Sequence, residues 1–159
     1  NLSFHETTDV RAARLRIYLV DRADYAATIR ATAWRDADTA FLESNDCATV
    51  LAARPSGIVR ALVYLVADDG GRAFAHCMAE EITQSLGPVN DSDLLAGSLF
   101  NDRSKLTGLG RLDWLILGVL YHERIRPGMR EADVRPLLPA VIDDVLLQLP
   151  ADLLARPLP

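Results

Sequence analysis

Four polar side chains near the end of one predicted helix have a spacing that suits chemistry. In the stretch EEITQSLGPVND, which begins at Glu80, Glu80 and Gln84 are four residues apart and therefore share a helix face. Glu81 follows Glu80, and two adjacent carboxylates can push their pKa values apart, as general acid–base chemistry requires. Neighbours on a helix point about 100° apart, so we expect only one of the two glutamates to face a given cleft. Asn90 follows in the loop after the helix.

Two histidines extend this set. His76 lies four residues before Glu80, so His76, Glu80 and Gln84 form a ladder that can hold a metal ion weakly. His122 is expected to approach the same cleft from a later helix. The structural alternatives are a surface or capped histidine at position 76 and, for His122, a favourable positive charge at a helix C-terminus.

The ligand types argue against a resident metal. Zinc prefers imidazole or thiolate ligands. Glu80, Gln84 and Asn90 would instead offer one carboxylate and two amides, so zinc is not expected. Calcium is the less favoured alternative, because its oxygen ligands would come from Glu80, Asn90, Asp91 and Asp93, which have no recognised loop spacing. We therefore predict no cofactor. In the structural alternative, Asn90 and Asp91 form a turn, Gln84 satisfies main-chain groups at the helix end, and the glutamates are solvated.

Hydrophobic periodicity predicts the elements that must position these residues. Runs rich in β-branched residues predict strands over 15–20, 47–54 and 58–69, the last two joined as a hairpin by Pro55-Ser56-Gly57. Predicted helices include one that Asp21 or Asp24 caps and that ends near Trp34, and others over 72–86, 111–122 and 130–149, the last interrupted or started by Pro136 and Pro139.

The order of these elements is strand–helix–strand–strand–helix, followed by a loop over 88–110 and a helical C-terminal part. It predicts a single α+β domain over residues 1–159, with a small mixed sheet and with 1–10 and 150–159 held loosely. A length of 159 residues fits one domain.

Composition excludes two classes of function. The net charge is -5 and no basic stripe with interleaved aromatic residues is present, so we expect no nucleic-acid partner. The longest apolar runs are too short to span a bilayer, so no transmembrane segment is predicted.

The two cysteines, Cys47 and Cys77, are far apart and in no CxxC arrangement. Their spacing leaves open whether they are buried thiols or a disulfide, which would imply an oxidising compartment. The chain begins at Asn1 without Met, so we interpret it as a mature or shortened form, with any export signal preceding it.

With histidine at positions 80, 84 and 90, the opening stretch would read HExxHxxGxxH, the zinc-binding line of metzincin peptidases. QSLGPVND also resembles the matrixin-type HxLGLxHS, SLF at 98–100 stands where such families place the Met-turn, and LTGLGRLDWLILGVLY resembles their downstream helix. The resemblance implies a distant metzincin-like (zincin) fold with a degenerate site. Only Glu81 matches a functional position, that of the general base, and Leu99 stands near the Met-turn position.

The chain is more similar to a family of uncharacterised bacterial proteins, some of them described as lipoproteins. These share ELTQxLGxxND-like and LDWxxLxxLY…PGM-like segments, and the matching pieces here are EEITQSLGPVND, SLFND and LDWLILGVLYHERIRPGM. This resemblance implies a periplasmic or cell-envelope location and is compatible with a lipid anchor before Asn1. It also favours a Cys47–Cys77 disulfide over free thiols.

Two functions remain, and whether the protein is an enzyme stays open. The favoured one is a non-catalytic, pseudo-metallopeptidase-like envelope protein whose cleft binds a peptide, a glycan or a partner protein. The alternative is a divergent hydrolase or peptidase with Glu81 as general base in a rebuilt or metal-free site. The residues predicted to form the cleft are His76, Glu80, Glu81, Gln84, Asn90, Asp91 and His122.

Overall fold

A computed structural model describes residues 3–101 and 103–154 and has the predicted α+β organisation. Its three strands are β1 (Leu15–Val20), β2 (Cys47–Arg54) and β3 (Gly57–Val66). They form one mixed sheet in the order β1–β3–β2, in which β3 pairs parallel to β1 and antiparallel to β2. The predicted small mixed sheet followed by a helical C-terminal part is therefore confirmed.

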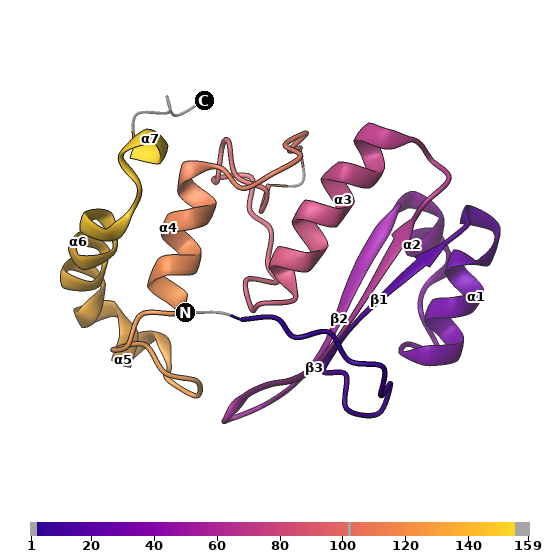
Figure 1. Cartoon of the computed structure of the whole chain (residues 1–159), viewed down its shortest axis with the longest axis horizontal. Helices are drawn as coiled ribbons and strands as arrows, with labels where there is room; N and C mark the ends of the chain where they lie inside the picture. Colours follow the sequence, from indigo (N-terminus) through magenta and orange to yellow (C-terminus); the bar gives the residue numbers. More distant parts are fainter. Residues whose placement is uncertain (1–2, 102, 155–159) are drawn as a thin grey trace.

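The helices cover both faces of the sheet and continue beyond it. They are α1 (Arg22–Thr32), α2 (Thr39–Ser44), α3 (Gly71–Gln84), α4 (Arg111–Leu120), α5 (Glu131–Val134), the 3-10 helix η1 (Arg135–Leu137), α6 (Leu138–Gln148) and α7 (Ala151–Leu154). In Figure 1, α1 and α2 lie on one side of the sheet and α3 on the other, while α4 and α6 lie beyond α3. Across the described residues, no helix combines the length and apolar character needed to cross a membrane.

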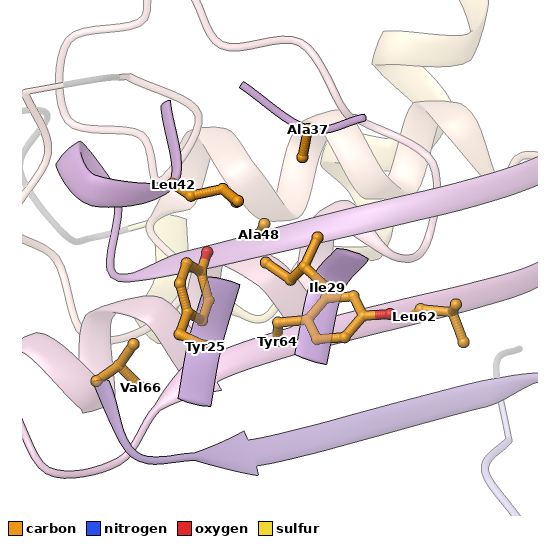
Figure 2. Close-up of a cluster of buried hydrophobic side chains, with 8 residues drawn as sticks. All are labelled: Tyr25, Ile29, Ala37, Leu42, Ala48, Leu62, Tyr64 and Val66. Atoms are coloured by element: carbon orange, nitrogen blue, oxygen red, sulfur yellow. The ribbon is translucent and has the colours of Figure 1, made fainter. Parts of the chain in front are cut away.

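From Ala61 to Val66, strand β3 is buried on both faces, because α1 packs on one face of the sheet and α3 on the other. Leu62 and Tyr64 pack with Tyr25 and Ile29 of α1 in the cluster that Figure 2 shows. Residues at alternate positions of a strand point to opposite faces, so Val63 and its neighbour Leu65 face α3 instead. This double burial explains the nearly continuous apolar sequence of the strand.

Several predicted boundaries differ from the observed ones by one to three residues. β3 ends at Val66, not at residue 69, because Asp68 turns back and accepts a hydrogen bond from the main-chain N–H of Arg22 at 2.8 Å. The Arg22 guanidinium also pairs with Asp46 and Asp69, which anchors the start of α1. Helix α3 ends at Gln84, two residues early, and α4 ends at Leu120.

The sequence did not predict helix α2. Its first turn is capped by Asp38, whose carboxylate accepts from the N–H of Phe41 at 2.9 Å. Leu42 then packs into the cluster under α1. Six residues are too few for a periodic apolar signal, so the cap and tertiary contacts such as that of Leu42 stabilise the helix.

The C-terminal region is divided as its prolines require. Pro136 and Pro139 occupy early positions of η1 and α6, where the missing N–H costs nothing, so the predicted helix over 130–149 is interrupted. Of the predicted loose tail, residues 151–154 instead form α7 with Leu153 buried, and residues 155–159 lie outside the described part. At the other end, residues 3–10 are exposed and without helix or strand.

Helices α4 and α6 make close contact at Gly118. A Cβ atom there would lie 2.5 Å from Cγ1 of Val145, a buried residue of α6. The absence of a side chain therefore sets the distance between the two helices.

Gly118→Ala is expected to lower the free energy of unfolding by about 1–3 kcal/mol through overpacking. This loss outweighs the helix propensity of alanine, which favours the variant by about 1 kcal/mol. Urea denaturation measures the difference. Gly108→Ala is the control, because no atom lies within 4 Å of its Cβ position. Equal stability of the two variants would contradict the close contact.

Candidate functional site

Helix α3 carries most of the predicted site, and two links hold it on the edge strand β2. Cys47 of β2 and Cys77 of α3 form a disulfide with a Cα–Cα distance of 5.7 Å. One helical turn later, the Thr49 hydroxyl donates to the carbonyl oxygen of Glu81 at 2.9 Å. These links turn the Cys77–Glu81 side of the helix toward the sheet.

Glu81 is consequently a buried carboxyl group. The residue is 6% exposed, and within the described residues its Oε2 atom has no hydrogen-bond partner. Burial raises the pKa of Glu81 to about 7, and the Glu80 and Asp91 carboxylates add to the rise, while Thr49 opposes it. At neutral pH the group is poised between its two protonation states.

Glu80 lies close to Glu81 despite the angle between neighbouring helix positions. Carboxylate oxygens of the two residues and the sulfur of Cys47 lie within 4.8 Å of one another. The sulfur is oxidised and is therefore no thiolate ligand. Two carboxylates alone are a poor zinc set.

His76 and Glu80 meet, as the predicted ladder requires. Nε2 of His76 lies 3.3 Å from Oε2 of Glu80, and Nδ1 lies 2.6 Å from the carbonyl oxygen of Leu106. His76 thus connects α3 to the loop over 88–110. Gln84, the third ladder member, pairs with Asp91 of the loop.

Gln84 instead turns toward the loop that follows α3. Its side-chain amide donates to both carboxylate oxygens of Asp91, at 3.1 and 3.3 Å, while Asn90 is exposed. Asp93 pairs with Arg103 at 3.3 Å. In residues 3–101 and 103–154 the only group of three His, Cys, Asp or Glu side chains close enough to hold a metal ion is Cys47–Glu80–Glu81, and calcium binding stays a prediction.

His122 lies elsewhere, on the wall of a cavity of about 900 Å³ between α3, α4 and α6. Its Nδ1 accepts from the N–H of Arg124 at 3.2 Å, and its Nε2 lies 3.6 Å from Asp144 of α6. Of the seven predicted cleft residues, it alone is among the described residues lining this cavity. The residues that line the cavity from the three helices, or from the positions just after their ends, include Ile82, Leu86, Trp114, Leu117, Tyr121, Asp144, Val145, Gln148 and Leu149.

A buried carboxylate organises the loop between α3 and α4. Asp113 is fully buried and accepts from the hydroxyl of Ser98, from the N–H of Leu99 at 3.0 Å, and from the N–H of Gly110 at 2.7 Å. The last bond caps α4, because the Asp113 carboxylate satisfies a main-chain N–H at the start of the helix. The same side chain fixes the SLF segment over 98–100 beside the start of α4.

The comparisons with known proteins identify the family. A family model described as a protein of unknown function, DUF2927, matches residues 1–140. The chain belongs to the DUF2927 family. No curated protein and no solved structure matches it. The predicted membership of an uncharacterised family is thus confirmed, and the zincin likeness remains a hypothesis.

Sequence reasoning did not predict the cavity of this DUF2927 protein. Trp114, Asp144 and Gln148 come from helices that were predicted but not paired with each other. The available signal was Gly118 inside a strongly apolar helix, because a glycine there indicates close approach of another element. Nothing in the sequence indicated that the partner is α6.

The raised pKa of Glu81 predicts a pH dependence of stability. Between pH 4.5 and about 7 the unfolded chain has released this proton while the folded protein retains it, so stability falls as pH rises through that window. The loss is of the order of 3 kcal/mol, since each pKa unit corresponds to about 1.4 kcal/mol. Glu81→Gln is expected to remove it.

Urea denaturation of the native protein and of Glu81→Gln between pH 4.5 and 8 measures this difference. Glu43→Gln, at an exposed position of α2, is the control and should follow the native curve. Parallel curves for the native protein and Glu81→Gln would show that burial does not perturb the carboxyl group.

Proposed function

We propose that this DUF2927 protein is a non-catalytic, zincin-like protein of the bacterial cell envelope that binds a peptide, a glycan or a partner protein. One contrast carries the proposal. Glu81 and Gln84, which correspond to the general base and the second zinc ligand, are buried within the fold. The cavity of about 900 Å³ lies on the adjacent face of α3, where it is lined by Ile82 and by Leu86 just after the helix.

The connections around α3 support a zincin-like arrangement. The helix ends just before Gly87, whose φ of 132° suits only glycine, and the chain then turns into the loop that carries Asp91. Asp113 joins the SLF segment to the start of α4, so two of the three stretches that resemble metzincins are connected by hydrogen bonds.

The disulfide supports an envelope location. Disulfides form and persist in oxidising compartments such as the periplasm, and they are rare in the cytosol. The Cys47–Cys77 bond joins two different elements and lies beside α3, so it contributes to the main support of the site.

A second candidate function, a hydrolase with Glu81 as general base, is favoured by one observation. A buried carboxyl group with an unpartnered oxygen and a pKa near 7 has the properties of a catalytic acid or base. The low exposure of Glu81 favours the non-catalytic function, because a substrate must reach within hydrogen-bond distance of a general base.

Two measurements on the native protein test the proposal. Elemental analysis after purification without chelators is expected to find no stoichiometric transition metal. A broad peptide library is incubated with the native protein or with Glu81→Gln, with and without added zinc. Mass spectra of the peptides are expected to be the same for both proteins, with no Glu81-dependent cleavage.

Glu43→Gln is again the matched control for the effect of losing one carboxylate. Cleavage that the control retains and Glu81→Gln loses would establish the hydrolase and overturn the non-catalytic proposal. One equivalent of a transition metal would also overturn it.

A further inference from the structure

The cavity beside α3 has apolar walls contributed by three helices. Ile82 comes from α3 and Leu86 from the turn after it, Leu117 comes from α4, and Val145 comes from α6, with Leu149 just after that helix. Such walls suit aliphatic side chains, because burying apolar surface drives binding in pockets of this size. A ligand that is polar throughout would lose hydration here without compensation.

Two aromatic residues stand at the cavity with much of their surface accessible. Trp114 is 45% and Tyr121 44% exposed, and both belong to the α4 region. They are seven residues apart, so they lie on the same helix face about 10 Å apart along the axis. The Tyr121 hydroxyl donates to the carbonyl oxygen of Leu86 at 2.6 Å, which fixes that side chain. Ring faces of this kind attract cations.

The charged groups on the cavity wall are acidic. The described residues that line it include Glu123 and Asp144 but no lysine or arginine. Asp144 has 41% of its side chain exposed, and it lies 3.5 Å from the Arg124 guanidinium and 3.6 Å from Nε2 of His122. Both distances exceed the roughly 2.7–2.9 Å of a charge-assisted hydrogen bond, so the carboxylate keeps capacity for a further donor.

We infer that the cavity binds an apolar peptide segment carrying one basic side chain, whose cationic group pairs with Asp144 and whose aliphatic neighbours contact the walls. The inference rests on the proposed function and specifies its ligand. Carboxylates in a hollow with low-dielectric walls focus a negative potential, so a cation is attracted more strongly there than at an open surface. The aliphatic stem of lysine or arginine also matches apolar walls.

The sequence offers a direct readout of occupancy. Its only two tryptophans are Trp34 and Trp114, so in the Trp34→Phe variant the one remaining indole is that of Trp114 at the cavity. The probes are acetylated, amidated tetrapeptides of leucine in which one residue is replaced by lysine, norleucine or glutamate. Titration of Trp114 fluorescence gives the Kd of each peptide, and a chito-oligosaccharide serves as the glycan probe.

The lysine peptide is expected to bind roughly tenfold more tightly than the norleucine peptide, and the glutamate peptide more weakly than both. Asp144→Asn should reduce the preference for lysine to roughly twofold. Asp143→Asn is the matched control, because Asp143 is the adjacent exposed carboxylate and does not line the cavity. Circular dichroism verifies that both variants are folded, and Glu123→Gln tests the second carboxylate.

The outcomes separate the inference from the proposed function. Equal binding of all three peptides would overturn the preference for a basic side chain while leaving a peptide-binding cavity. The same holds if Asp143→Asn loses as much of the preference for lysine as Asp144→Asn does. Binding of the oligosaccharide alone would replace the peptide by a glycan. If no probe changes Trp114 fluorescence, both the inference and the binding function of this cavity fail.

Discussion

The attachment of α3 to the edge strand β2 determines the chemistry of this protein. The Cys47–Cys77 disulfide and the hydrogen bond from Thr49 fix one rotation of the helix about its axis. That rotation places the Glu81 carboxyl group in a low-dielectric environment and leaves Ile82 to face α4. A helix held less firmly would turn the carboxylate into water, where its protonation would be that of an ordinary glutamate.

The two faces of α3 therefore have different roles. On one face, polar side chains pair with the loop after the helix, as Gln84 does with Asp91 and His76 with the carbonyl oxygen of Leu106. On the other face, apolar residues form one wall of an open cavity. In a working zinc peptidase the polar face would be the accessible one. Here accessibility and polarity are separated, and this separation is the physical argument for binding without catalysis.

Much of the fold follows from local sequence, while the site depends on long-range contacts. The apolar run of β3 and the glycine after α3 are signals within a few residues, so those elements were predictable. The rotamer of Gln84 depends on Asp91, and the partner of His122 is Asp144, 22 residues away in another helix. No periodicity within one segment can report such pairs.

The disulfide has a mechanical consequence. It closes a ring from Cys47 to Cys77, a separation of 30 residues that includes the entire β2–β3 hairpin. A force applied to the two ends of the chain would pass through the sulfur–sulfur bond and bypass the hairpin. About 100 Å of contour length would then stay hidden during forced extension, and would appear only after reduction. A cut at the exposed turn, Pro55–Ser56, would likewise leave both pieces joined.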